Sequence, residues 1–217
     1  MRFSILSLLV VTFVIAGGFA LTRPKPNKWE SMSVKAAVER LETTIQKYEP
    51  EFKFTAQPLP AAQIAKLKRE LPDAPQQFFE LLEISDYQSS KLFSIWETVP
   101  YDELKDASEK TQARYNSLGF GWEGWHGTNS PCCQADKFWR DKWLPIGDVN
   151  GNEVFIDMDP TEDGIPGQIV IVQTDGWYMS LMGYSIAHWL HRIADQIEAD
   201  GQYARSAFIH QPMPPVR

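Results

Sequence analysis

The spacing of apolar residues predicts three helices in the first part of the globular chain. Apolar side chains recur about every 3.6 residues over 34–48, 60–71 and 75–84, as in helices with one buried side. Ser33 is suited to cap the first helix, and Pro72 follows the second. The residues expected to face inward are Val34, Val38, Leu41, Ile45, Tyr48, Ile64, Leu67, Leu71, Phe78, Phe79, Leu81 and Leu82.

The pattern changes after residue 90. The short apolar run KLFSIW (91–96) predicts a strand, and residues 101–118 return to a helical spacing. The stretch 119–142 has no clean period and is rich in glycine. It also holds three of the tryptophans of the chain, namely Trp122, Trp125 and Trp139.

Four short runs with strand character follow: WLPIG (143–147), EVFIDM (153–158), QIVIV (168–172) and WYMSLM (177–182). Turns containing Asn-Gly or Asp-Gly separate them, and such turns are typical of antiparallel hairpins. A final helix follows, with apolar residues at 186, 190, 193 and 197. Ser185 is suited to cap it and Gly201 to end it.

This order of elements predicts an α+β fold. We expect an antiparallel β-meander sheet packed by N-terminal helices and one C-terminal helix, preceded by an apolar N-terminal helix. Strands and helices do not alternate, which disfavours a parallel nucleotide-binding sheet. We expect two parts: residues 1–28 as a signal-anchor or signal peptide with a short linker, and residues 29–217 as one globular domain.

Residues 3–21 carry no charge and are almost wholly apolar. A helix of this length comes close to the roughly 30 Å hydrocarbon thickness of a bilayer, so we expect a membrane-anchored, single-pass chain. The alternative is a secretory signal, with export to the periplasm or cell envelope after cleavage near Ala20. The positive-inside tendency favours a cytoplasmic domain, because three basic residues follow the run: Arg23, Lys25 and Lys28.

The chain is acidic, with 28 Asp and Glu against 21 Lys and Arg and a formal charge of −7. Residues 1–28 contain four basic residues and no acid, so the remainder carries −11. Such a domain repels phosphate backbones, which argues against a nucleic-acid binder. It suits a basic protein partner, because long-range charge steers encounter. Alternatively, the acidity serves solubility alone.

The segment 143–172 resembles the central block of the SUKH superfamily, whose best-known branch is the fungal cell-wall-assembly regulators of the Smi/Knr type. That block has a Trp before a Pro-Ile-Gly run, a glycine turn, a strand ending in Asp-x-Asp-Pro, and Gly-Gln before a β-branched strand. Here these are Trp143, Pro145-Ile146-Gly147, Gly151, Asp157, Asp159-Pro160 and Gly167-Gln168. Residues 59–82 are similar to the opening helices of the family, and 185–193 to its closing helix.

The resemblance covers about residues 59–200 and implies a binding scaffold without known chemistry. Bacterial members are commonly immunity proteins that neutralise a cognate toxin, and fungal members regulate wall synthesis through protein contacts. The resemblance therefore implies a protein partner, with no cofactor, no metal and no catalytic residue. The Trp-rich stretch 119–142 and the apolar segment 3–21 depart from the family pattern.

Four acids and three tryptophans are candidates for contacting that partner: Asp157, Asp159, Glu162, Asp163, Trp122, Trp125 and Trp139. We expect Asp157 and Asp159 to share one strand face, where paired carboxylates suit acid/base chemistry, but no nearby His or Lys supplies a second role. Carboxylates that satisfy turn amides are the alternative. The tryptophans suit an aromatic docking surface, with a small satellite core or a sugar-stacking platform as alternatives.

Two patterns resemble metal sites. Residues 148–159 are similar to a calcium loop, but Glu153 stands where that loop needs glycine, which favours a hairpin. His188 and His191 are three apart on the final helix and would need a third ligand to bind zinc, so ordinary packing is favoured. The only two cysteines, at 132 and 133, are neighbours and indicate neither a zinc set nor a disulfide framework.

These observations predict a non-catalytic, membrane-associated protein-binding domain of SUKH type. We expect an immunity protein that blocks a toxin by covering a basic site. One alternative is a cell-envelope factor that binds wall polysaccharide through Trp122 and Trp125. Another is an envelope hydrolase that uses Asp157 and Asp159.

Overall fold

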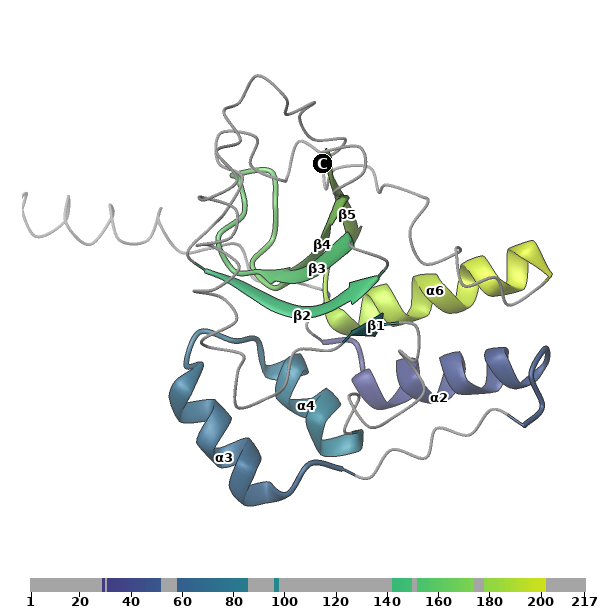
Figure 1. The fold of residues 1–217 in the computed structure, drawn as a ribbon, viewed down its shortest axis with the longest axis horizontal. Helices are drawn as coiled ribbons and strands as arrows, with labels where there is room; N and C mark the ends of the chain where they lie inside the picture. Colours follow the sequence, from purple (N-terminus) through teal and green to yellow (C-terminus); the bar gives the residue numbers. More distant parts are fainter. Residues whose placement is uncertain are drawn as a thin grey trace, which may run out of the picture.

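The computed structural model describes residues 29, 31–51, 58–85, 96–97, 142–149, 152–173 and 178–201. These residues form an antiparallel sheet with helices packed on it, which confirms the predicted α+β class (Figure 1). The expected apolar N-terminal helix and the helix over 101–118 lie outside the described residues. Among the helices that are described, none has the length and apolar character needed to span a bilayer.

The described helices lie close to their predicted positions: α2 (Val34–Gln46), α3 (Ala61–Glu70), α4 (Gln76–Ile84) and α6 (Ile186–Asp200). Ser33 caps α2 by accepting a hydrogen bond from the Ala36 N–H at 3.2 Å. Ser185 caps α6 in the same way, from the His188 N–H at 3.2 Å. Helix α6 ends at Gly201, whose φ of 62° is the left-handed conformation that favours glycine.

The sheet is a meander in chain order, with four main strands: β2 (Trp143–Val149), β3 (Asn152–Asp157), β4 (Gln168–Gln173) and β5 (Tyr178–Gly183). A two-residue strand β1 (Trp96–Glu97) pairs with the end of β2 and contains Trp96 of the predicted 91–96 strand, whose other residues lie outside the described part of the chain. All neighbouring strands are antiparallel, as the turn residues predicted. The turns at 150–151 and 174–177 lie outside the described residues.

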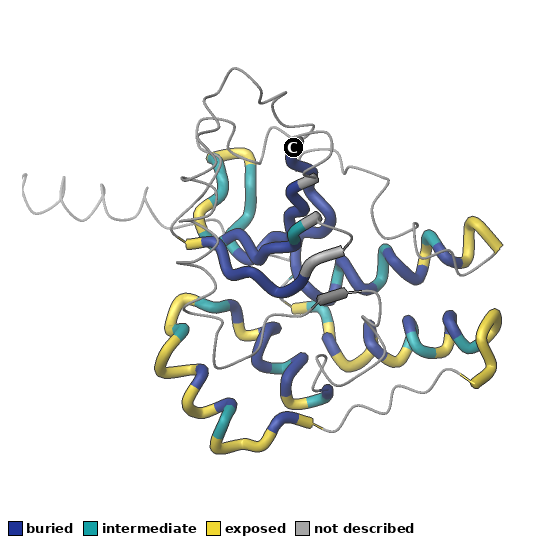
Figure 2. The backbone as a smooth tube through the Cα atoms, viewed as in Figure 1, coloured by how far each residue is buried: buried dark blue, intermediate teal, exposed yellow. Residues whose placement is uncertain are grey.

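Both faces of the sheet are buried. On one face, alternate strand residues such as Val154, Ile156 and Ile169 join the main core with the apolar sides of the helices. The opposite face carries a second cluster with Trp29 and Ile165 packed against it: Trp143, Phe155, Val170, Val172, Met179, Leu181 and Tyr184. Figure 2 shows the strands as buried and the outer sides of α2, α3 and α6 as exposed.

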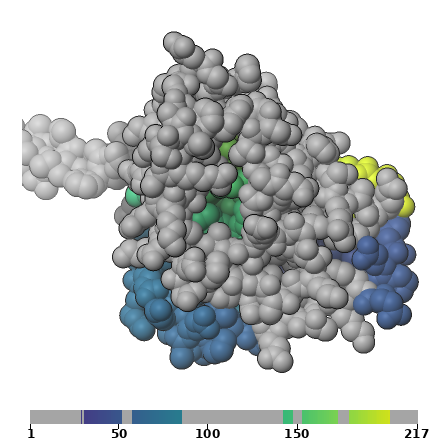
Figure 3. Space-filling model, viewed as in Figure 1, coloured from purple at the N-terminus to yellow at the C-terminus, as the bar shows by residue number. Residues whose placement is uncertain are grey.

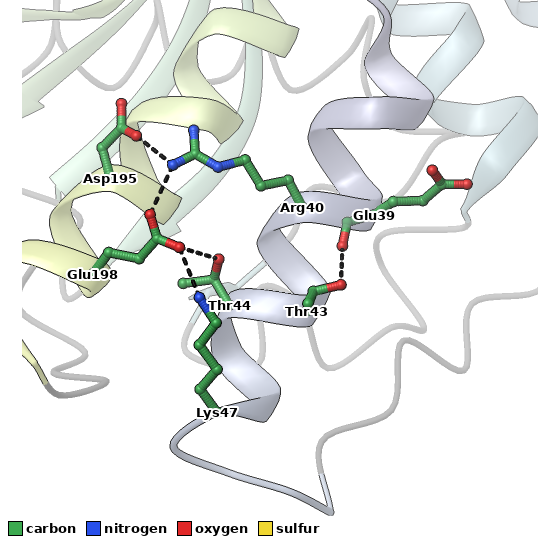
Figure 4. Close-up of polar contacts among 7 residues, drawn as sticks. All are labelled: Glu39, Arg40, Thr43, Thr44, Lys47, Asp195 and Glu198. Atoms are coloured by element: carbon green, nitrogen blue, oxygen red, sulfur yellow. Dashed lines mark hydrogen bonds and ion pairs between the residues drawn. The ribbon is translucent and has the colours of Figure 1, made fainter.

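Helices α2 and α6 lie side by side and are joined by charged residues (Figure 4). The Arg40 guanidinium pairs with the carboxylates of Asp195 and Glu198, the latter at 2.9 Å, and the Lys47 amine lies 2.9 Å from Glu198. The Thr44 hydroxyl also donates to Glu198, at 3.4 Å. Lys47 and then Arg40 lower the pKa of Glu198 to about 2. Because these groups are partly exposed, solvent weakens each pair.

Strand β5 approaches the start of α6 too closely to carry a side chain at its last residue. A Cβ on Gly183 would lie 2.6 Å from the Trp189 Cβ and 2.8 Å from the Trp189 Cα. Trp189 is 2% exposed and packs in the main core, so it has little room to move. Glycine at 183 therefore sets how closely the sheet and α6 pack.

Gly183→Ala is expected to lower the free energy of unfolding by about 2 to 3 kcal/mol, because β5 and α6 must separate. Urea unfolding of the full chain measures the loss. Gly201→Ala is the control, since no atom lies within 4 Å of a Cβ there and only the left-handed backbone is strained. That control is expected to lose about 1 kcal/mol. Equal losses in the two variants would contradict the close-approach explanation.

Candidate partner-binding surface

Three of the predicted acids lie on the turn that connects β3 to β4, residues 158–167, which we call the acidic turn. Asp159, Glu162 and Asp163 are all exposed on it. The turn contains no Lys or Arg. It therefore presents three carboxylates to solvent on one short segment.

Asp157 lies in a different environment. It is the last residue of β3 and is 1% exposed, so Asp159 does not share a strand face with it as expected. The Asp157 carboxylate accepts hydrogen bonds from the Asp159 N–H at 2.9 Å and from the Gln168 side-chain amide at 2.9 Å. Gln168 is 0% exposed, and its side-chain oxygen accepts from the Ile165 N–H at 3.1 Å. This buried pair holds both ends of the acidic turn.

The burial of Asp157 corrects its expected role. A carboxylate that points inward, with both oxygens accepting hydrogen bonds, is not available to a partner on the surface. We therefore keep the expectation of partner contact for Asp159, Glu162 and Asp163 only. Asp157 instead accepts hydrogen bonds from amides of the turn, which was the alternative expected from the sequence. The same burial disfavours an acid/base pair of Asp157 and Asp159, because a substrate cannot reach both.

The acidic turn packs against the start of α4. Gly167 has a φ of 87°, and a Cβ there would lie 3.5 Å from the Pro75 side chain. The Gly167 N–H donates to the Asp157 carbonyl at 2.8 Å, which closes the turn on the end of β3. Exposed Asp73 lies two residues before Pro75, so a fourth carboxylate stands on the neighbouring segment.

A second polar centre joins the starts of three helices. The Gln77 side-chain amide donates to the carbonyls of Trp29 at 3.0 Å and Met32 at 3.1 Å, and its oxygen accepts from the Ala187 N–H at 3.0 Å. The Ser185 hydroxyl also donates to the Trp29 carbonyl, at 3.2 Å. Gln77 is 2% exposed. No sequence pattern marks this residue, because its partners lie 45 to 110 positions away.

The Trp29 ring stacks on His188, with 4.4 Å between centroids, and on Tyr184, at 5.2 Å. The His188 Nδ1 accepts from the Tyr184 N–H at 3.2 Å, which requires that nitrogen to be unprotonated. Burial, then the positive charge of Arg192, then His191 lower the pKa of His188 to about 4. Asp195 opposes this shift. His188 is therefore neutral at pH 7 and serves packing, as favoured from the sequence.

The other predicted sites are the three tryptophans, the two cysteines and the metal-binding patterns. Trp122, Trp125, Trp139 and the two cysteines lie outside the described residues, and so do the contacts a polysaccharide platform would use. Strand β3 runs through the residues of the calcium-loop pattern. Asp148 pairs with Glu153 near the start of this strand, and Asp159 follows its end. In the part of the chain that the structure describes, no group of three or more His, Cys, Asp or Glu side chains is arranged to hold a metal ion.

A shallow, mainly apolar groove of about 350 Å³ runs along α3 and is lined by Leu59, Ala61, Ile64, Ala65, Lys68 and Glu83. Its two charged residues pair with each other, since the Lys68 amine lies 3.4 Å from the Glu83 carboxylate. The same amine lies 5.3 Å from the centre of the Phe79 ring. Both charged side chains of the groove therefore already have partners within the domain.

Asp157→Asn is expected to lower the free energy of unfolding by about 2 kcal/mol, because two amide donors would face each other at the buried pair. Asp157→Asn combined with Gln168→Glu restores the match of donors and acceptors and is expected to recover part of the loss. Asp163→Asn, on the exposed turn, is the control and is expected to change stability by less than about 0.5 kcal/mol. Urea unfolding measures all three. If Asp157→Asn were as stable as Asp163→Asn, the role of the Asp157–Gln168 pair would be contradicted.

The stability of the chain is expected to fall as pH drops from 6.5 towards 4, because the unfolded state protonates His188 before the folded state does. After screening by solvent, the contribution is about 2 kcal/mol, present in full above the ordinary pKa of histidine. His188→Asn keeps an acceptor for the Tyr184 N–H but does not titrate. The free energy of unfolding, measured across this pH range, should depend less on pH in that variant than in the unsubstituted chain. The same pH dependence in both would contradict the role assigned to His188.

Residues 58–192 match the family model described as SMI1 / KNR4 family (SUKH-1). The match includes α3, α4, every described strand and the first part of α6, and it covers more than half of the chain. Among curated proteins, no sequence matches the chain. The match agrees with the resemblance carried by Trp143, the Asp157–Pro160 segment and Gly167-Gln168. The chain therefore belongs to the SMI1/KNR4 (SUKH-1) family.

Proposed function

We propose that this SUKH-family domain is a non-catalytic binding protein whose acidic turn docks on a basic surface of a protein partner. One observation carries the proposal. The buried Asp157–Gln168 pair holds a turn on which Asp159, Glu162 and Asp163 are exposed together. A surface that is ordered before binding loses less conformational entropy when its partner docks.

Charge supports the same partner class. Asp73 stands beside the acidic turn at the start of α4, and residues 29–217 carry a formal charge of −11. A field of one sign speeds the encounter with a partner of the other sign and disfavours partners of the same sign. The partner face is therefore expected to be rich in Lys and Arg.

The family supports an inhibitory role for this contact. Bacterial members are commonly immunity proteins, so we propose that the partner is a toxin. The mechanism is occlusion: the acidic turn covers a basic site that the toxin needs for its own substrate. Such a mechanism requires a tight complex and no turnover.

The double variant Glu162→Lys with Asp163→Lys is expected to weaken binding to a toxin encoded beside this chain by at least about tenfold. Much of this loss should appear as slower association that depends on salt concentration. The measurement is surface-based binding kinetics with the full chain in detergent.

The matched control is Glu49→Lys with Glu51→Lys. These exposed acids follow α2, at the end of the molecule away from the acidic turn (Figure 1), and the change in net charge is the same. The control should retain most of the affinity. Equal loss in both double variants would assign the effect to net charge, and no loss in either would reject the acidic turn as the docking surface.

We also propose that residues 3–21 hold the chain on a membrane. The support is their sequence alone: an uncharged apolar run long enough to span the hydrocarbon region, followed by Arg23, Lys25 and Lys28. The positive-inside tendency favours the cytoplasmic side for the domain. A reporter fused to the C-terminus that is active on only one side of the bilayer tests this orientation, and activity on the outer side would reject it.

A further inference from the structure

The face of the sheet turned away from the main core, which we call the outer face, is apolar across all four main strands. Phe155, Val170 and Leu181 are direct neighbours on β3, β4 and β5, and the Trp143 ring of β2 lies 5.0 Å from the Phe155 ring. Every residue of this cluster is at most 7% exposed. An antiparallel sheet with helices on one face commonly has polar residues and water on the other. The outer face is instead part of the interior.

The described helices do not account for this burial. Their buried apolar residues all belong to the main core, and Figure 1 shows the four helices on that side of the sheet. Among the described residues, the partly buried hydrophobics on the outer face are Trp29 and Ile165. These two side chains cannot by themselves screen seven apolar residues from water. Only a small part of the strands is visible in the surface view of Figure 3, in agreement with their burial.

Residues 98–141 begin and end beside this sheet. They follow Glu97, which pairs with β2 near its end, and they precede Lys142, whose carbonyl accepts a hydrogen bond from the Met158 N–H at 3.2 Å. Both attachment points lie at β2, whose 7 residues span about 23 Å. A connection of 44 residues is far longer than this separation requires. Because both of its ends are fixed at the sheet, the segment loses less entropy by packing there than a free tail would.

The composition of residues 98–141 suits an apolar surface. Aromatic side chains bury a large area at a small entropic cost, and this segment holds seven of them: Tyr101, Tyr115, Phe120, Trp122, Trp125, Phe138 and Trp139. The C-terminal residues 202–217 hold two aromatic residues, Tyr203 and Phe208. They also follow the end of α6, a helix that packs on the opposite face. Attachment and composition therefore both favour residues 98–141 over the C-terminal tail.

We propose that residues 98–141 pack on the outer face of the sheet and form a further layer of the domain. Trp122, Trp125 and Trp139 are among the side chains that cover this face. The occupant of the outer face is thus a segment of this chain, and the three tryptophans stabilise the domain instead of contacting a toxin or a polysaccharide. This assignment does not depend on the identity of the partner that the acidic turn binds.

Photo-methionine, a methionine analogue whose side chain bonds to neighbouring atoms on irradiation, tests this packing. Met179 lies on the outer face and is 0% exposed, whereas Met182, three residues later on β5, lies in the main core. The full chain carrying the analogue is irradiated in detergent, and linked peptides are mapped by mass spectrometry. Met179 is expected to link to residues 98–141. Met182 is expected to link to the helices instead.

Two matched variants assign the links. Met179→Leu should remove the links to residues 98–141, and Met182→Leu should keep them, because both replacements nearly conserve side-chain volume. The absence of links between Met179 and residues 98–141 would overturn the proposal, whether Met179 links to residues 202–217 or only to described residues. Links between isotope-labelled and unlabelled chains in a mixture would assign the outer face to a second copy and overturn it as well. The map of the unsubstituted chain decides the question even if a variant fails to fold.

Discussion

The buried hydrogen bond between Asp157 and Gln168 is the contact on which the shape of the acidic turn depends. The two residues are the last pair of the β3–β4 ladder and are 1% and 0% exposed. A carboxylate at this depth is costly unless its oxygens accept hydrogen bonds. Shifting β3 by one residue would separate the pair and turn the apolar side chains of the strand to the opposite faces. One contact therefore supports both the register of the sheet and the start of the turn.

The parts of the fold that depend on neighbouring residues could be predicted from the sequence. Ser33, Ser185 and Gly201 lie at the ends of runs with helical spacing, where capping is decided within one turn of helix. The direction of the Asp157 side chain could not be predicted in this way. It depends on where β3 ends and on Gln168, eleven positions later. The contacts of Gln77 span still longer separations, so its helical surroundings suggested only an ordinary polar residue.

Helix α2 lies outside the residues that match the family model. The family match covers residues 58–192, so α2 lies before it and the last turns of α6 lie after it. These two flanking parts hold each other: Arg40 and Lys47 of α2 pair with Asp195 and Glu198 of α6. Buried Leu41 and Ile45 add apolar contact on the same side. Helix α2 is thereby fixed to the matched region through α6.

The long separation between Trp29 and its partners has a consequence for biosynthesis. Ser185, which binds the Trp29 carbonyl, lies 156 positions further along the chain. At common translation rates the ribosome needs on the order of 10 seconds to make that stretch. The apolar segment therefore leaves the ribosome long before the site that seats Trp29 exists. Trp29 can therefore be seated only near the end of synthesis, after Ser185 and the start of α6 have been made.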